Sequence, residues 1–207
     1  SSETLIEHEV DIEACALSSD GSHVAIADER AEVTLLSVND QKQSRKVGVG
    51  RGRWLTLGFS DDDDWLIAGG VEHAVTLWPL ALGTRRPVGQ STRFRGLPSP
   101  ALDVVFTPKA KGFITYGVNA HFRHWSLDGK PPGALPEFSD NGGDPVNDLV
   151  ISQDGRWSVL ACAAAGPSEC APVKLLKLGE TEKYVLGHHH ERATGVAIST
   201  DQRWLAS

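Results

Sequence analysis

The chain of 207 residues contains one short pattern five times, and this repetition constrains its fold more than any other feature. In each copy, two apolar residues flank a small or β-branched residue and precede a Ser or Thr anchor. The anchors are Ser18, Ser60, Thr107, Ser152 and Ser199, and their spacings are 42, 47, 45 and 47 residues. Such regularity is typical of a protein built from one repeated supersecondary unit, each copy of which buries its apolar surface against its neighbours.

The residues around each anchor predict short antiparallel β-strands. Large and small residues alternate before the anchor, as in a strand with one tight face. Turn-forming residues such as Asp20-Gly21 and Asp154-Gly155 follow the anchor and favour a tight hairpin. A second apolar strand comes after each turn, and a third ends at Leu36, Trp78, Trp125 and Leu176. A less regular segment completes the copy, so we expect four strands per repeat of about 45 residues, the pattern of a propeller blade.

The predicted fold class is therefore all-β: a β-propeller of four-stranded antiparallel blades, with about four and a half blades in an incomplete ring. We expect a single domain over 1–207. Its repeats are placed at approximately 10–48, 52–96, 100–140, 145–187 and a truncated 192–207, with 1–9 as the outer strand of a preceding blade.

These motifs resemble the WD-repeat β-propeller family, in a degenerate form similar to bacterial repeats. A repeat of that family combines a Gly-His pair, a Ser-Pro-Asp-Gly-like turn and a third strand ending in Trp-Asp. Here Gly187-His188 precedes Ser199, and His8 precedes Ser18. The resemblance implies structural roles for His8, Ser18, Ser60, Trp78, Thr107, Trp125, Ser152, His188 and Ser199.

The repeats also depart from the family pattern. No Trp-Asp dipeptide occurs, because Trp78 is followed by Pro79 and Trp125 by Ser126. The family's Asp, which helps tie His, Ser and Trp together, is replaced by Arg30, Glu72, Asn119 and Cys170. We therefore expect an incomplete hydrogen-bond network in every blade. Family members commonly have seven blades, which would need roughly 310 residues, so the remaining blades are expected outside this chain and the piece alone is expected to be unstable.

Composition argues against several classes of function. The chain has 20 Lys and Arg against 27 Asp and Glu, a net charge of −7, which does not suit a nucleic-acid binder. No apolar run approaches the roughly 18 to 20 residues of a membrane span. Three cysteines are too few for a disulfide framework and favour the cytoplasm, although the sequence does not fix the compartment. The chain starts with Ser and lacks Met, so we expect a processed or partial product.

No motif predicts catalysis, a cofactor or a metal. The run His188-His189-His190 lies on a predicted strand, whose side chains alternate in direction and cannot all reach one ion. Asp61 to Asp64 coincide with a turn, where Asp is favoured. Gly48 to Gly52 lack the spacing of a phosphate-binding loop. The anchor serines have no Gly-x-Ser-x-Gly setting, so they are expected to make strand-end hydrogen bonds.

The three cysteines carry two further expectations. Cys15 lies on a strand of small residues and is expected to be buried. Cys162 and Cys170 flank an inserted segment and could pair, whereas the chain has no Cys-x-x-Cys motif for zinc.

The sequence thus predicts a non-catalytic protein–protein interaction scaffold rather than an enzyme, because loops on a rigid scaffold are where binding residues gather. Two connecting segments carry the candidate partner-binding residues, which are Arg51, Arg53, Arg85, Arg86, Arg93 and Arg95. They are either solvated edge charges or a basic patch for an acidic partner. The alternative function is the sensory or regulatory region of a larger bacterial signalling enzyme, with an NTPase, kinase or protease domain outside this chain.

Overall fold

The computed structural model describes residues 10–40, 43–80, 82, 89–117, 121–127, 138–139, 146–154, 156–164, 170–177, 183–190, 192–199 and 201–207. Apart from one short 3-10 turn at Pro108–Ala110, the regular structure of this part is entirely β. It forms four antiparallel four-stranded sheets and one two-stranded sheet, which confirms the predicted all-β class and its four-stranded unit. The described residues include no helix of the length and apolarity that a membrane crossing requires.

Each four-stranded sheet is a meander whose strand order follows the sequence. Blade 1 contains β1 (Ile12–Leu17), β2 (His23–Asp28), β3 (Glu32–Ser37) and β4 (Ser44–Val49). Blade 2 contains β5 (Trp54–Phe59), β6 (Trp65–Gly70), β7 (Ala74–Pro79) and β8 (Thr92–Arg95). Blade 3 contains β9 (Ala101–Phe106), β10 (Gly112–Gly117), β11 (His121–Ser126) and β12 (Phe138–Ser139). Blade 4 contains β13 (Val146–Ile151), β14 (Trp157–Cys162), β15 (Ala171–Lys177) and β16 (Lys183–His189), and β17 (Ala197–Ile198) and β18 (Leu205–Ala206) form a terminal hairpin.

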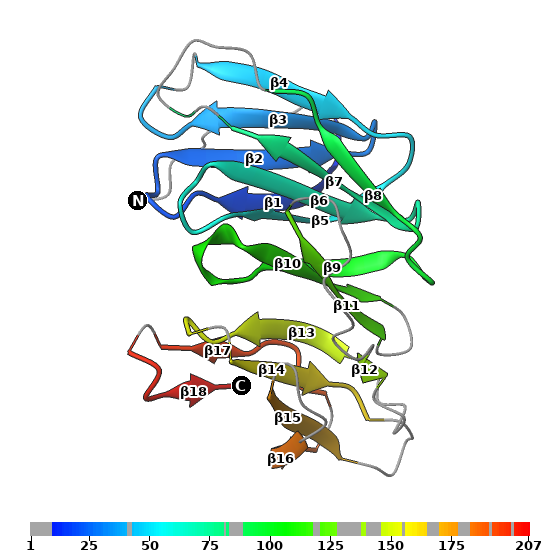
Figure 1. Ribbon diagram of the computed structural model, residues 1–207, viewed down its shortest axis with the longest axis vertical. Coiled ribbons are helices and arrows are strands. Elements are labelled where there is room, and N and C mark those ends of the chain that lie inside the picture. The colour runs from blue at the N-terminus through cyan, green and yellow to red at the C-terminus, as the bar shows by residue number, and fades with distance from the viewer. Residues whose placement is uncertain are drawn as a thin grey trace.

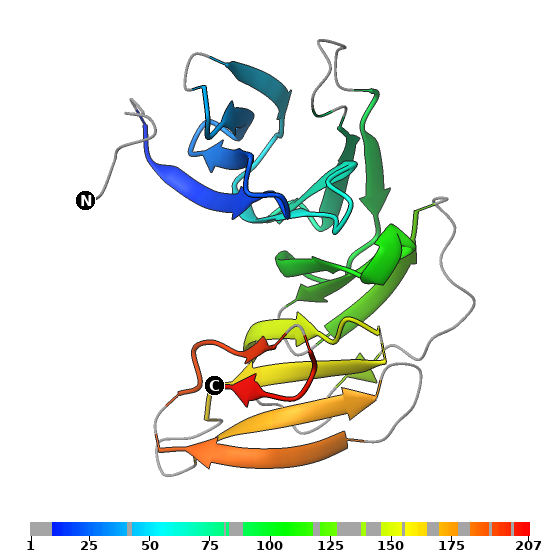
Figure 2. The same cartoon turned by 90° about the vertical axis from the view of Figure 1, so that its left-hand side faces the viewer.

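The blades stack in chain order with their first strands side by side (Figure 1). β1 packs beside β5, β5 beside β9, and β13 beside both β9 and β17. Viewed from the side, the sheets form an arc with blade 1 at one end and the terminal hairpin at the other (Figure 2). Within the described residues, no strand of the hairpin pairs with blade 1, so these sheets do not close a ring.

The middle strands of the blades bury both faces, because successive side chains point to opposite sides of a sheet. On β6, Leu66 and Ala68 pack toward blade 1, whereas Ile67 between them packs toward blade 3. On β10, Phe113 faces blade 2 and Ile114 faces blade 4. The core is therefore divided into apolar layers, one between each pair of neighbouring blades, and each fully buried large side chain contributes about 1.5–3 kcal/mol.

Three of the six tryptophans, Trp54, Trp78 and Trp125, are buried in these layers, whereas Trp204 is 72% exposed. The rings of Trp54 and Trp78 meet edge to face with centroids 5.8 Å apart, and Trp54 Nε1 donates to the carbonyl of Ala31 at 2.9 Å. Trp125 Nε1 donates to Thr115 Oγ1 at 2.9 Å within blade 3. A buried indole N–H needs such a partner, so the Trp125–Thr115 pair supplies a polar link inside blade 3.

The structure shows the exposure and the pairing of the three cysteines. Cys15 is exposed, so the prediction that it is buried is wrong. The reason is that Ala14 and Ala16 on the opposite face of β1 pack into the layer with blade 2, whereas no described sheet covers the face of Cys15. Cys162 is buried and Cys170 exposed, and they do not form a disulfide. The predicted outer strand at 1–9 lies outside the described residues.

Candidate functional site

The anchor serines lie in the turns that join the first two strands of a blade. The Ser18 hydroxyl donates to Asp20 Oδ1 at 2.7 Å and accepts the backbone N–H of His23 at 2.9 Å. The same arrangement recurs in three other repeats, with Ser60 between Asp62 and Trp65, Ser152 between Asp154 and Trp157, and Ser199 between Asp201 and Trp204. These hydroxyls stabilise the hairpin turns, and each donates its hydrogen atom to an Asp carboxylate.

In three of these turns, hydrogen bonds lower the pKa of the Asp carboxyl group and favour its ionised form. Hydrogen bonds from the hydroxyls of Ser22 and Ser18 and the amide of Ser22 lower the pKa of Asp20 to about 2. Hydrogen bonds from the anchor serines lower the pKa of Asp154 and of Asp201 in the same way. A hydrogen-bonded Ser–Asp pair thus recurs at four turns, where it stabilises the hairpin.

Thr107 is the exception among the anchors. Its backbone N–H bonds to the carbonyl of Gly112 at 2.9 Å, but its hydroxyl is buried and has no partner. The following residues are Pro108 and Lys109, and Lys109 adopts a φ of 62°. No Asp stands two residues after the anchor, so the turn forms without a side-chain acceptor.

The acidic run at Asp61 to Asp64 serves turn geometry and a contact between blades. Asp62 accepts from Ser60, as described above. Asp63 reaches blade 1, where its two carboxylate oxygens accept the backbone N–H groups of Ser19 at 2.7 Å and Asp20 at 3.1 Å. Among the residues that the structure describes, no three His, Cys, Asp or Glu side chains are placed to share a metal ion.

Of the two histidines of the sequence motif, the structure describes His188, which forms no hydrogen bond with an anchor serine among the described residues. His188 is exposed on β16, the outer strand of blade 4. His189 Nε2 lies 2.9 Å from the hydroxyl of Ser207, a contact with the last residue of the chain. His8 lies outside the described residues.

Two acidic residues on the innermost strands were missed by the sequence analysis. Asp103 on β9 accepts the hydroxyl of Thr56 from blade 2 at 2.9 Å, and burial raises its pKa. Asp148 on β13 accepts the N–H of Val196, just before the terminal hairpin, at 2.8 Å. Asp103 and Asp148 each lie four residues before the anchor of their repeat. This shared position is the sequence signal that could have identified them.

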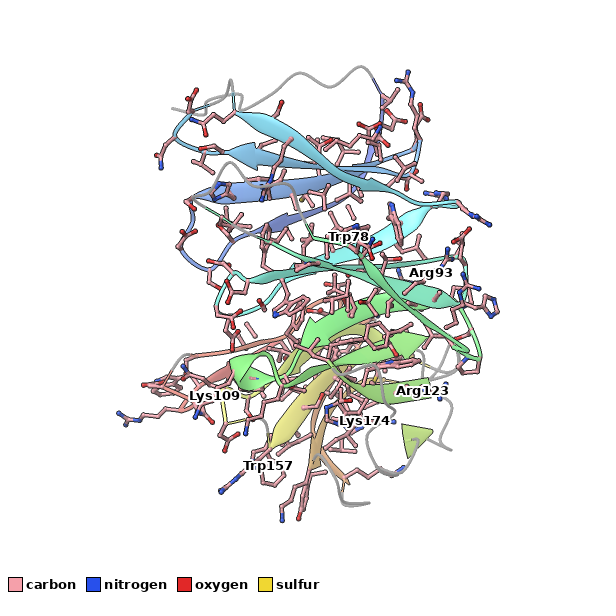
Figure 3. The ribbon with its side chains drawn as sticks, turned by 45° about the horizontal axis from the view of Figure 1, so that its top comes forward. Trp78, Arg93, Lys109, Arg123, Trp157 and Lys174 are labelled. Carbon is pink, nitrogen blue, oxygen red and sulfur yellow. The ribbon has the colours of Figure 1, made fainter. Side chains whose placement is uncertain are left out.

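Three of the six candidate arginines gather at one edge of blade 2, next to the connection from blade 1. Arg51, Arg93 and Arg95 line an open hollow of about 520 Å³ together with Glu72 and His73. Arg51 comes from the β4–β5 connection, Glu72 and His73 come from the β6–β7 turn, and the other two arginines come from β8. Arg93 and Arg123 lie at the edge of the sheets away from Lys109 (Figure 3). We call this site the arginine hollow, and Ala74 and Gly96 complete its lining.

Only part of the positive charge in the arginine hollow is compensated. Arg93 forms an ion pair with Glu72, and its Nε is buried without an acceptor. Arg51 and Arg95 are exposed and form no ion pair with any described residue. The hollow therefore presents more cationic than anionic groups to a ligand.

The other arginines from the sequence analysis do not join this site. Arg53 pairs with Glu13 of β1, and this contact raises the pKa of the Arg53 guanidinium. Arg85 and Arg86 lie outside the described residues. Arg123, which the sequence analysis did not single out, donates from Nη1 to the carbonyl of Gly96 at 2.6 Å and stacks over the ring of Trp125.

A second open hollow of about 480 Å³ meets the first at Arg93. It lies between β4 of blade 1 and β8 of blade 2, and Trp54 and Trp78 are among the residues that line it. Apart from Arg93, the described residues of its lining are uncharged, and they are Val47, Gly48, Val49, Gly50, Trp54, Thr76, Trp78, Gly89, Gln90 and Ser91. We call it the neutral hollow.

No protein-family model matches the chain, and no curated protein matches it. The resemblance to WD repeats therefore rests on the repeated residues themselves, and any function must be argued from the geometry of the two hollows.

Proposed function

We propose that the chain is a non-catalytic protein–protein interaction scaffold, a WD-repeat-like propeller segment that binds acidic segments of partner proteins at the arginine hollow. One observation carries this proposal. Arg51 from the β4–β5 connection and Arg93 and Arg95 from β8 face one open hollow, whose described lining holds a single carboxylate, Glu72.

The chemistry of the hollow favours binding over reaction. Guanidinium groups offer planar forks of N–H donors that match carboxylates, and such charge-assisted hydrogen bonds are among the stronger ones. The lining residues that the structure describes include no Ser, Thr or Cys that could act as a nucleophile. The stacked blades hold the contributing turns in place, as a scaffold for recognition requires.

A fluorescein-labelled octaglutamate peptide provides the direct test, with fluorescence anisotropy as the readout. We expect saturable binding that weakens as salt rises from about 50 mM to about 500 mM, because exposed ion pairs are screened. The double variant Arg51→Ala/Arg95→Ala is expected to weaken binding roughly tenfold or more, since each lost charged contact costs on the order of 1 kcal/mol.

The matched control is Arg156→Ala/Arg203→Ala, which removes two exposed arginines at the anchor turns of blade 4 and the terminal hairpin. This control changes net charge by the same amount, so binding should be close to that of the unmodified chain. Equal losses in the two double variants would mean that affinity follows net charge alone, and no saturable binding would reject the proposed site.

A further inference from the structure

The stack of blades has an apolar face at each end that no described sheet covers, and we propose that these two faces bind each other between copies of this chain. They belong to blade 1 and to the terminal hairpin, at the two ends of the arc (Figure 2). The face of blade 1 turned away from blade 2, here called the head face, carries Ile12, Cys15, Leu17 and Val24. The face of the hairpin turned away from blade 4, here called the tail face, carries Ala197, Trp204 and Ala206. The partner is a second copy of this chain, and the inference goes beyond the proposed function without depending on it.

Packing inside the two end sheets fixes these directions, because successive side chains of a strand point to opposite faces. Ala16 of β1 packs into the layer with blade 2, so Leu17 points away from blade 2. Ile198 of β17 packs against blade 4, so Ala197 points away from blade 4. Residues that pair across two strands share a face, so the partners of Leu17 and Ala197 lie on the head face and the tail face as well.

The repeat shows how the head face is built to pack. Leu17 and Val24 form a cross-strand pair directly before and after the anchor turn of blade 1. Phe59 and Leu66 hold the same positions relative to their anchor in blade 2 and form the same pair. Both lie in the apolar layer through which blade 2 packs on blade 1. The head face therefore repeats the surface that a blade uses to pack on the blade before it.

Exposure distinguishes the head face from its counterpart in blade 2. Trp54 is 4% exposed beneath blade 1, whereas Ile12, at the same position of its own repeat, is 47% exposed. Leu57 is buried in the same layer, whereas its equivalent Cys15 is exposed. Leu17 is 61% exposed. Contiguous exposed apolar side chains of this kind are typical of a protein interaction site, because covering them removes apolar surface from water.

The tail face repeats the complementary surface. Ala197 and Ala206 pair across the terminal hairpin at the positions that Ala16 and Ala25 hold in blade 1. In blade 1 these two small residues pack against the larger side chains of blade 2. Ala197 and Ala206 are exposed, so the hairpin offers the same small-residue surface without a described blade upon it.

Trp204 adds a large apolar side chain to the tail face. It is 72% exposed, whereas Trp65, at the same position in blade 2, packs against the layer between blades 2 and 3. That layer contains Phe106 and Phe113, which hold in blade 3 the positions of the cross-strand pair on the head face. A head face docked on the hairpin would therefore cover the Trp204 indole as blade 3 covers Trp65.

The contact between copies relies on apolar burial rather than on charge. At the junction of blades 1 and 2, the Asp63 carboxylate accepts two backbone N–H groups of the preceding turn. Gly21 holds the position of Asp63 in blade 1, so a docked copy lacks this polar link. Association should therefore persist at high salt, in contrast to peptide binding at the arginine hollow. Because the two faces differ, each pair of copies still has one free head and one free tail.

Sedimentation velocity of the 207-residue chain tests the association. We expect the average mass to rise about twofold or more between about 1 µM and about 200 µM, as mass action requires of a self-associating chain. The rise should be retained in about 500 mM salt, which screens exposed charges but not apolar contacts. A chain that stays monomeric over the whole range overturns the inference.

Two variants test whether the contact runs from head to tail. Leu17→Asp places a charge on the head face and Ala206→Asp places one on the tail face, both at exposed positions that should not disturb the fold. Each variant alone should stay monomeric, whereas an equimolar mixture should form pairs, because one variant keeps its tail face and the other its head face. Val185→Asp, at an exposed position of β16 that belongs to neither face, is the matched control and should associate like the unmodified chain. Thermal melting of every variant checks that the fold is retained.

Cys15 reports the contact without any substitution. Its alkylation by iodoacetamide, followed by peptide mass spectrometry, should slow roughly twofold or more at concentrations at which the chain associates, because each pair covers one of its two head faces. Cys170 is exposed just before β15, outside both faces, and serves as the internal control whose alkylation rate stays the same.

The remaining outcomes reject the head-to-tail contact. If Leu17→Asp abolishes association and Ala206→Asp does not, the copies pair through their head faces alone. If the mixture of the two variants stays monomeric, or if neither variant weakens association, other surfaces make the contact. Equal alkylation of Cys15 in the associated and the monomeric chain leads to the same conclusion. None of these measurements uses an acidic peptide, so their failure leaves the proposed function standing, and a loss of peptide binding leaves this inference standing.

Discussion

Thr56 and Asp103 join the inner strands of blades 2 and 3, with 2.9 Å between Thr56 Oγ1 and Asp103 Oδ1. The Asp103 carboxylate also accepts the N–H of Val104 at 2.7 Å. Burial outweighs these two hydrogen bonds and raises the pKa of Asp103 above 3.8. The carboxylate is therefore easier to protonate in the folded chain than in the unfolded one.

We predict that Asp103 makes the fold less stable as pH rises. The pKa of this acid is raised on folding, so its favourable contribution is complete below 3.8 and is lost as pH rises through the higher folded pKa. The Asp103→Asn variant lacks this dependence. Its free energy of unfolding should therefore rise relative to that of the unmodified chain as pH increases from about 3 to about 7, the range set by ordinary Asp values. Urea unfolding across that range measures the difference. A difference that is constant with pH, or that runs in the opposite direction, contradicts the prediction.

We predict opposite effects of removing two anchor hydroxyls. Ser60 is fully buried and makes two hydrogen bonds through its hydroxyl, so Ser60→Ala should lower the free energy of unfolding by about 1–2 kcal/mol. The Thr107 hydroxyl is buried without a partner, so Thr107→Val should leave stability unchanged or raise it. Chemical denaturation of both variants provides the measurement, and equal losses would show that the hydrogen bonds at Ser60 do not matter.

We predict an unusually acidic carboxyl group at Asp20. Carboxyl-carbon NMR should give a pKa of about 2, and Ser22→Ala should move it toward 3.8 because the largest stabilising hydrogen bond is lost. A pKa lowered on folding adds stability above 3.8 that disappears as pH falls toward 2. The control is Ser44→Ala, since Ser44 is exposed on β4, the outer strand of blade 1. An unshifted Asp20 in the unmodified chain would contradict the geometry of the turn.

We predict that two glycines respond differently to substitution by Ala. A Cβ at Gly48 would lie 2.7 Å from Trp78 Nε1, so Gly48→Ala should cost about 1–3 kcal/mol and alter tryptophan fluorescence. A Cβ at Gly187 would meet nothing within 4 Å, so Gly187→Ala should change stability by less than about 0.5 kcal/mol. Thermal melts compare the two, and a costly Gly187→Ala would indicate that β16 is covered by something outside the described residues.

The sequence could predict the strands because their signals are local. Alternating residues before the anchors and Asp-rich turns after them depend on near neighbours only, and the apolar run at Trp65–Ala68 is indeed the core of β6 (Trp65–Gly70). The buried faces follow from the same alternation, since Ile67 and Leu66 must point to opposite sides of the sheet.

Contacts between blades could not be predicted in this way, because they depend on how successive sheets are offset. Asp63 was recognisable as a turn residue, but its bonds to the backbone of Ser19 and Asp20 join two repeats. The arginine hollow has the same origin, since Arg51 and Arg93 meet only when the β4–β5 connection lies against β8. Cys15 was misjudged because the residue pattern of β1 does not say which of its faces meets another sheet.

The alternation of apolar layers also determines which substitutions of core side chains the fold can tolerate. Phe113 and Ile114 are adjacent in sequence, yet they belong to different apolar layers, which share no residue in the part of the chain that the structure describes. A change in volume at Phe113 must be accommodated by Phe94 and Trp125, and one at Ile114 by residues of blade 4. The two faces of a blade therefore belong to separate cores, and compensating substitutions should be sought within the same apolar layer rather than along the strand.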